Sequence, residues 1–230
     1  MFDITGLEKK LSVSFKDKQL LTAALTHRSY INENPATSTG HNERMEFLGD
    51  AVLELAITEY IYEKFPEKPE GELTSLRASL VNANMLGDIA NDLGVNSFLL
   101  LSRGEAKDVG RARLYILANA MEAIIGAMYL DRGYETTKDF IIRILAPKIG
   151  PILEKKLYRD AKSLFQEEAQ DKVGITPTYE VSKEWGPDHD KHFVIGVYLN
   201  GDLIAEGEGP SKQSAQQQAA EAALKAKGWG

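Results

Sequence analysis

The segment HNERMEFLGDAVLEL, from His41 to Leu55, places four carboxylates among apolar side chains. On an α-helix, which turns about 100° per residue, these carboxylates fall within an arc of roughly 80°. They belong to Glu43, Glu46, Asp50 and Glu54, which we call the acidic strip. Apolar residues are expected on the opposite side (Met45, Leu48, Val52, Leu55) and along the borders of the strip (Phe47, Leu53). Because like charges three and four residues apart repel each other on a helix, the pattern indicates a compensating partner, and a cation is the simplest candidate.

A second segment, from Leu114 to Leu130, contains a single charged residue, Glu122, with Asn119 three positions earlier on the same helical face. Small residues recur around them, so a neighbouring helix can approach closely, and we expect this helix to be buried on nearly all sides. A buried carboxylate without a partner is costly or takes up a proton. A hard cation shared between Glu122 and the acidic strip would remove both difficulties. Oxygen ligands without cysteine favour Mg²⁺ or Mn²⁺ over Zn²⁺.

Both patterns also have plainer interpretations. Charges at helical spacing commonly form a solvated helix face, and Asn119 and Glu122 can form a buried hydrogen-bonded pair. Taken alone, the two segments indicate a metal site and say nothing about a substrate.

Composition narrows the class of protein. A chain of 230 residues with 43% hydrophobic content predicts one large or two smaller globular domains. It contains no cysteine, which excludes disulfides and thiolate metal sites. The N-terminus has no signal-peptide pattern, and the longest apolar run, 123–130, is too short to span a bilayer. We therefore expect a cytoplasmic protein with no membrane partner. The net charge of −7 means that any contact with phosphates must come from local clusters, helix N-termini or metal.

Residues 1–153 are predicted to be all-α, because their apolar residues follow helical spacing and no run alternates. Asp17 is a predicted N-cap. The helices are predicted to end at the prolines of FPEKPEGE, at Gly94 and at Gly133.

The pattern changes near Tyr158, and we predict a linker at 154–159 followed by an α+β module at 160–229. The module reads as helix, three strands and helix, in the order α-β-β-β-α. Asn200-Gly201 is a strong hairpin signal between the second and third strands, and Ser211 is the candidate cap of the last helix.

Three segments, NERMEFLGDAVLEL, EGELTSLRASLVN and ILANAMEAIIGAMYLD, occur in this order and together resemble the endonuclease domain of bacterial ribonuclease III. The module that follows resembles the double-stranded RNA-binding domain that accompanies it. The resemblance covers nearly the whole chain, from the segment Thr26-His27-Arg28-Ser29 to the last helix.

The resemblance implies functional roles at matching positions. Glu46, Asp50, Asn119 and Glu122 correspond to the metal ligands, and Asp50 and Glu122 to the two most directly catalytic residues. Glu43 and Glu70 correspond to accessory acidic positions near the cleft of a dimer. Asn119 stands where many members have aspartate, which lowers the negative charge of the site by one. Metal affinity is therefore expected to be weaker, or the ion to be bound more through water.

The resemblance further implies an endoribonuclease that hydrolyses double-stranded RNA with Mg²⁺, for which Mn²⁺ is a substitute, and that acts on no small-molecule substrate. It implies a homodimer whose two offset cuts leave short 3′ overhangs, with 5′-phosphate and 3′-hydroxyl ends. The implied targets are rRNA and mRNA precursors.

The C-terminal module is expected to hold the duplex by its shape, since the major groove of duplex RNA is too narrow for side chains to read. By resemblance, Gln166 and Glu167 contact one minor groove and His189, in the loop GPDHDKH, enters the next. Ser211 and Lys212 begin the helix that faces the phosphates between them. The same α+β module could instead bind protein.

Two other functions compete with this interpretation. A double-stranded RNA-binding protein with a decayed metal site would explain Asn119, although decay should not spare Glu46, Asp50 and Glu122. A helical di-metal oxidase would need Glu-x-x-His pairs, and the sequence contains none.

Overall fold

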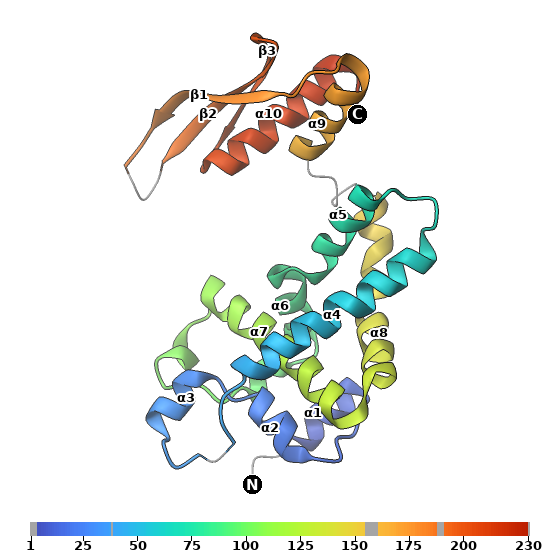
Figure 1. The fold of residues 1–230 in the computed structure, drawn as a ribbon. Helices are drawn as coiled ribbons and strands as arrows, with labels where there is room; N and C mark the ends of the chain where they lie inside the picture. The colour runs from blue at the N-terminus through green and yellow to red at the C-terminus, as the bar shows by residue number, and fades with distance from the viewer. Residues whose placement is uncertain (1–3, 38, 155–160, 188–190, 230) are drawn as a thin grey trace. The chain divides into compact units, whose positions relative to one another are not determined.

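The computed structural model describes residues 4–37, 39–154, 161–187 and 191–229. The predicted linker, 154–159, lies outside the described residues except for Glu154, and His189 lies outside them too. The chain divides into two compact units, 1–158 and 159–230, and each is described here by itself (Figure 1).

The N-terminal unit is built from helices, as predicted. They are α1 (Thr5–Leu11), α2 (Lys18–Ala24), α3 (Arg28–Glu33), α4 (Glu43–Lys64), α5 (Glu70–Val81), α6 (Ala83–Asp92), the short 3₁₀ helices η1 (Val95–Phe98) and η2 (Glu105–Lys107), α7 (Arg111–Arg132) and α8 (Tyr134–Glu154). The predicted signals are confirmed at three positions. The Asp17 side chain accepts a hydrogen bond from the backbone N–H of Gln19 and caps α2, and Gly94 and Gly133 follow α6 and α7 with positive φ angles.

One extended pairing ties distant parts of this unit together. Thr26 and Leu100 form an isolated parallel bridge, and the backbone N–H of Leu100 donates to the carbonyl of Leu25 at 2.9 Å. The bridge fixes the segment that leads into α3 against the segment that follows η1. Sequence reasoning did not predict it, because a single bridge has no periodicity.

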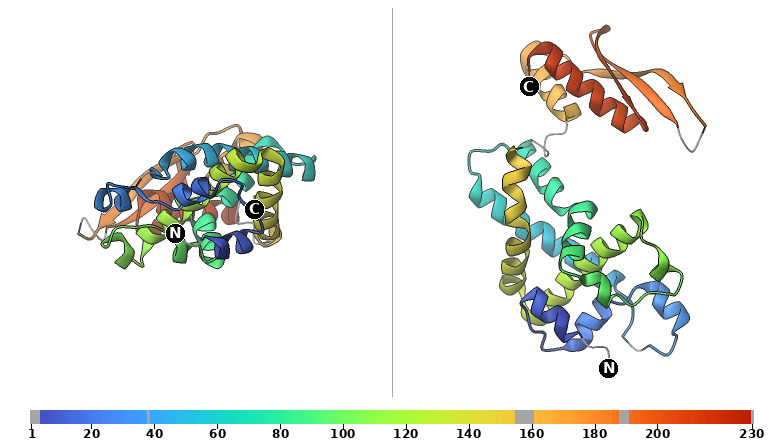
Figure 2. Two further views of the ribbon diagram at one scale, coloured as in Figure 1. Left: turned by 90° about the horizontal axis from the view of Figure 1, so that it is seen from below. Right: turned by 180° about the vertical axis from the view of Figure 1, so that it is seen from behind.

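The centre of the N-terminal unit is the crossing of α4 and α7, which Figure 1 and the reverse view in Figure 2 both show. Helix α7 is buried along most of its length, as its small and apolar residues predict. Among the described residues, α7 is also the one helix long and apolar enough to cross a bilayer, and more than half of that stretch is buried inside the unit.

The two helices approach each other at glycines. A Cβ atom added to Gly49 would lie 2.7 Å from the carbonyl carbon of Glu122 and 2.8 Å from the backbone nitrogen of Gly126. A Cβ atom added to Gly126 would lie 3.1 Å from the backbone nitrogen of Gly49. The helix backbones are therefore in direct contact, and no side chain separates them at this point.

The exposed side of α4 differs from the expectation. Leu53 is fully buried, but the Phe47 side chain is 82% exposed and that of Leu55 is 52% exposed. Leu55, which is expected on the side of α4 opposite to the acidic strip, is not covered by the core, because the helix presents apolar residues to two sides. Phe47, Ala51, Leu55 and Tyr62 form an exposed stripe on α4, which we call the apolar stripe. It runs beside the acidic strip.

The C-terminal unit has the predicted order α-β-β-β-α, with α9 (Ala161–Val173), β1 (Thr178–Trp185), β2 (His192–Leu199), β3 (Asp202–Gly209) and α10 (Lys212–Lys227). The strands form one antiparallel sheet in the order β1-β2-β3, and the helices pack on one face around Phe165 and Val197. Asn200 and Gly201 take positive φ angles of 52° and 89°, as the predicted hairpin turn requires. The Ser211 side chain accepts a hydrogen bond from Ser214 N and caps α10, also as predicted.

Gly49→Ala should destabilise the N-terminal unit by about 3 kcal/mol or more, since the new methyl group meets backbone that cannot rotate away. Thermal or urea unfolding measures the loss. Gly150→Ala is the matched control, because Gly150 is exposed near the end of α8 and its added Cβ would have no neighbour within 4 Å. The control variant should gain up to about 1 kcal/mol from helix propensity. Equal stability of the two variants would contradict the tight crossing.

Candidate active site

The crossing of α4 and α7 brings together four of the predicted site residues. Glu46 and Asp50 flank Gly49 on α4, and Asn119 and Glu122 lie one to two turns before Gly126 on α7. The Asn119 amide lies close enough to Glu46 across the crossing to lower the pKa of its carboxyl. Two segments that are about 70 residues apart in the sequence therefore supply one acidic surface.

The electrostatics of these carboxylates follow from this placement. The pKa of Glu122 is raised to about 7, chiefly by burial and in addition by the neighbouring charges of Asp50 and Glu46. Burial also raises the pKa of Glu46, together with the charges of Glu43 and Asp50, while the hydrogen bond from Asn119 opposes the shift. Glu122 is thus close to half-protonated at neutral pH.

The ends of the acidic strip are neutralised, whereas its middle is not. Arg28 on α3 donates to Glu43, with 3.1 Å between Nη1 and Oε1, and Arg77 on α5 lies 4.0 Å from the carboxylate of Glu54. In the part of the chain that the structure describes, no Lys, Arg or His nitrogen lies within 4.0 Å of the carboxylates of Glu46, Asp50 or Glu122. The protein therefore leaves three carboxylates uncompensated at one place.

Arg28 and Arg77 are residues that sequence reasoning missed. His27 caps α3 by accepting a hydrogen bond from Ser29 N, and this cap sets the start of the helix that carries Arg28. Arg77 is fixed by a second contact, a 3.1 Å hydrogen bond from Nη1 to Thr58 Oγ1. No local spacing signals either ion pair, because each joins residues on different helices.

The uncompensated residues fit a hard divalent cation by their chemistry. Three carboxylates and the Asn119 amide offer only oxygen ligands, and the raised pKa values mean that cationic side chains do not balance the charge. Across the described residues, no three Asp, Glu or His side chains converge on a common point. Like charges at this spacing repel one another, so an open arrangement is what the side chains alone favour.

Of the two accessory acidic residues, Glu43 lies one turn before Glu46 on α4 and Glu70 lies apart from the group. Glu43 is engaged by Arg28 and by His41, whose Nδ1 lies 3.7 Å from its Oε2. Glu70 is the first residue of α5 and accepts a 3.0 Å hydrogen bond from Thr74 Oγ1. Its charge is not among those that act on Glu46 or Glu122.

The predicted RNA-binding residues of the C-terminal unit lie on its two helices. Gln166 and Glu167 line an open pocket of about 540 Å³ on α9, together with Ser163, Gln170 and Asp171. Lys212 begins α10 directly after the cap Ser211, and its Nζ lies 5.7 Å from the centre of the Phe193 ring.

Comparison with known proteins agrees with this architecture. Residues 17–149 match the family model described as Ribonuclease-III-like, and residues 161–227 match the double-stranded RNA binding motif. A protein named Ribonuclease 3 from Pelotomaculum thermopropionicum is 46% identical over 221 residues, which cover 96% of this chain and 92% of that protein. Another of that name, from Natranaerobius thermophilus, is 46% identical over 218 residues, with 95% and 94% of the two chains covered.

Among solved structures, the nuclease domain of ribonuclease III from Campylobacter jejuni is 43% identical, with a TM-score of 0.58. The match covers 63% of this chain and 97% of that domain. The family-model matches span both units of the chain in the order in which the structure has them. The chain therefore belongs to the ribonuclease III family of endonucleases, which act on double-stranded RNA.

Proposed function

We propose that the protein hydrolyses phosphodiester bonds of double-stranded RNA with a divalent metal ion held by Glu46, Asp50, Asn119 and Glu122. The ion is Mg²⁺, and Mn²⁺ is a substitute. The observation that carries the proposal is the uncompensated middle of the acidic strip facing Glu122, while both ends of the strip are paired with arginine. If the acidic strip served only the stability of the fold, we would expect its middle carboxylates to be paired with cationic side chains, as those at its ends are.

When bound, the ion supplies an activated water and stabilises charge on the phosphate oxygens. Asp50 and Glu122 are the catalytic pair in this proposal, since they lie on the two crossing helices and the charge of Asp50 acts on Glu122. Asn119 stabilises the charged form of the neighbouring Glu46 and offers its own amide oxygen. Glu43 and Glu70 remain accessory. The products are 5′-phosphate and 3′-hydroxyl ends.

The C-terminal unit holds the duplex in this proposal. Gln166 and Glu167 on α9 and Ser211 and Lys212 on α10 are the contact residues, with His189 in the intervening loop. Side chains of this kind contact 2′-hydroxyls and phosphates rather than base edges, so recognition depends on the shape of the duplex. We propose rRNA and mRNA precursors as the targets and the cytoplasm as the compartment.

The apolar stripe on α4 supports a homodimer. Phe47 and Tyr62 are 82% and 71% exposed, and a row of such residues on one helix is costly to leave in water. A two-fold axis would place the apolar stripe of one protomer against the same stripe of its partner, and the two apolar surfaces would cover each other. The nuclease domain of the Campylobacter jejuni relative likewise has a region involved in dimer formation. Two active sites in such a dimer would cut both strands and leave short 3′ overhangs.

Cleavage of duplex RNA should depend on the metal ion and on Glu122. Wild-type protein should convert a long RNA duplex into short duplexes in the presence of Mg²⁺ and not in EDTA, and Glu122→Ala should be slower by more than about a hundredfold because a charged ligand is lost. Gel electrophoresis of end-labelled RNA measures the rates. Glu63→Ala, which removes an exposed carboxylate near the end of α4, is the matched control and should keep wild-type activity.

Cleavage that persists in Glu122→Ala would remove this residue from the mechanism. Binding of duplex RNA by wild-type protein without any cleavage in Mg²⁺ or Mn²⁺ would favour the competing function, a non-catalytic RNA-binding protein.

The raised pKa of Glu122 predicts that the folded protein becomes less stable as pH rises. Its pKa is about 7 in the folded protein against 4.5 in the unfolded chain, so the folded state holds the proton more tightly. The free energy of unfolding should fall as pH rises through this interval. In metal-free buffer at about pH 8, Glu122→Gln should be more stable than wild type by about 1–2 kcal/mol, and at about pH 5 by much less.

Thermal unfolding in EDTA across this pH range tests the prediction, with Glu63→Gln as a control that should follow wild type. Added Mg²⁺ should stabilise wild type at about pH 8 more than Glu122→Gln. A constant difference between the two proteins at all pH values would contradict the assigned cause.

Phe47→Asp should convert the dimer to a monomer at micromolar concentration, since it places a charge within the apolar stripe. Sedimentation velocity gives the oligomeric state, and circular dichroism checks that the helices remain. Leu203→Asp is the control, because Leu203 is also an exposed apolar residue but lies on β3 of the other unit. A wild-type monomer, or a dimeric Phe47→Asp variant, would refute the assignment of this interface.

A further inference from the structure

We propose that Arg111 binds a phosphate of the duplex beside the cut and that Tyr115 holds the Arg111 side chain in place. The inference rests on the proposed function in one respect, because it takes Glu122 as the position of the phosphate that is cut. It assigns a role to two residues outside the acidic site, at the N-terminal end of α7.

Arg111, Tyr115, Asn119 and Glu122 lie on one face of α7. At about 100° per residue they fall within an arc of roughly 80°. Asn119 and Glu122 are partly buried, whereas Tyr115 is 43% exposed and Arg111 is exposed. The face that carries the candidate catalytic carboxylate therefore continues outward into solvent and ends in a cation, about 16 Å farther along the helix axis.

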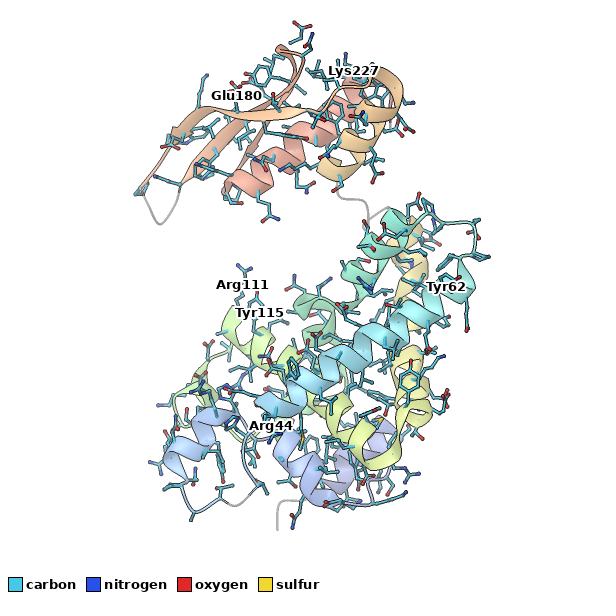
Figure 3. The ribbon with its side chains drawn as sticks, viewed as in Figure 1. Arg44, Tyr62, Arg111, Tyr115, Glu180 and Lys227 are labelled. Carbon is cyan, nitrogen blue, oxygen red and sulfur yellow. The ribbon has the colours of Figure 1, made fainter. Side chains whose placement is uncertain are left out.

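The Arg111 side chain is oriented by Tyr115. Its guanidinium carbon lies 5.7 Å from the centre of the Tyr115 ring, and its Nη2 donates to the Tyr115 hydroxyl at 3.3 Å. Figure 3 shows both side chains projecting together from the N-terminal end of α7. Stacking on the ring leaves the other N–H groups of the guanidinium available, so the cation is positioned without being neutralised.

Three other arginines near the site are already engaged by protein groups. Arg113 donates to the backbone carbonyls of Asp108 and Ala106, both at 3.0 Å, and so fixes the loop before α7. Arg28 and Arg77 are paired with Glu43 and Glu54. For Arg111, no carboxylate among the described residues lies within 4.0 Å. Of these four arginines, it is the one whose charge remains for a ligand.

The substrate supplies the reason for such a cation. A phosphodiester strand is repelled by Glu46, Asp50 and Glu122, and the chain as a whole carries a net charge of −7. A guanidinium stays charged at every relevant pH and binds a phosphate through two parallel N–H groups. A phosphate of the same strand, a few nucleotides from the cut, would then be held at Arg111 while the cut phosphate lies at Glu122.

The test uses the full chain and a short synthetic RNA duplex of defined sequence. Arg111→Ala should weaken binding in metal-free buffer by about three- to tenfold and lower the slope of log K against log salt by about one. With Mg²⁺, KM should rise by a similar factor while kcat stays within about twofold, since the lost contact is made equally in the ground state and in the transition state.

Arg111→Lys should recover part of the loss. Tyr115→Phe should stay near wild type, and Tyr115→Ala should approach Arg111→Ala.

Lys64→Ala is the matched control. Lys64 forms the same kind of pair with a tyrosine four residues away, since its Nζ lies 2.9 Å from the Tyr60 hydroxyl and 5.0 Å from the ring centre. This pair is at the C-terminal end of α4, where Figure 3 shows Tyr62, about 21 Å along the helix from Asp50. Its loss removes one positive charge from the same unit and should leave binding and KM unchanged.

A second measurement locates the contact. Single phosphates near the cut are replaced by uncharged methylphosphonates, and each duplex is bound by wild type and by Arg111→Ala. One replacement should weaken binding by wild type about three- to tenfold. The same replacement should have no effect on Arg111→Ala, because that variant has already lost the contact with this phosphate. Equal sensitivity of both proteins at every phosphate, or equal effects of Arg111→Ala and Lys64→Ala, would overturn the inference.

The outcomes separate this inference from the proposed function. Binding is measured without metal, so Arg111 can fail the test while Glu122 still proves essential for cleavage. Conversely, cleavage by Glu122→Ala would refute the catalytic proposal and leave the binding result for Arg111 unchanged.

Discussion

The site depends on the contact between two helix backbones. Gly49 and Gly126 let α4 and α7 touch without intervening side chains, and only glycine permits this distance. Acidic side chains within one turn of each glycine then lie near enough for their charges to act on one another, because a helix fixes the direction in which each side chain leaves it. The same contact belongs to the most buried helix of the N-terminal unit, so the stability of its core is tied to the shape of the site.

This packing holds together charges that would otherwise separate. The burial of α7 stabilises the crossing, and the repulsion among Glu46, Asp50 and Glu122 opposes it, as the raised pKa of Glu122 records. Arg28 and Arg77 remove the repulsion at the ends of the acidic strip, and so confine it to the middle. A bound divalent cation would relieve this residual repulsion, and its binding would then stabilise the folded protein.

Much of this was readable from local sequence, and the rest was not, for identifiable reasons. The caps Asp17 and Ser211, the Asn200-Gly201 turn and the burial of α7 all follow from spacing within one element. The pairs Arg28–Glu43 and Arg77–Glu54 join different helices, so no periodicity reports them. The exposure of Phe47 was missed because an exposed apolar residue on a helix has the same spacing as one in the core.

An acidic protein that acts on a polyanion has to distribute its charge unevenly, and α7 illustrates how one helix does so. Along a single face, Glu122 and Asn119 lie where the helix is partly buried, and Tyr115 and Arg111 lie where it is exposed. Burial strengthens the field of the carboxylate toward a metal, whereas exposure leaves the guanidinium accessible to a strand in solution. Asn119 fits this order, because an aspartate there would add a fourth uncompensated charge between Glu122 and the cationic end. The amide therefore moderates the repulsion at the site that the incoming phosphate has to approach.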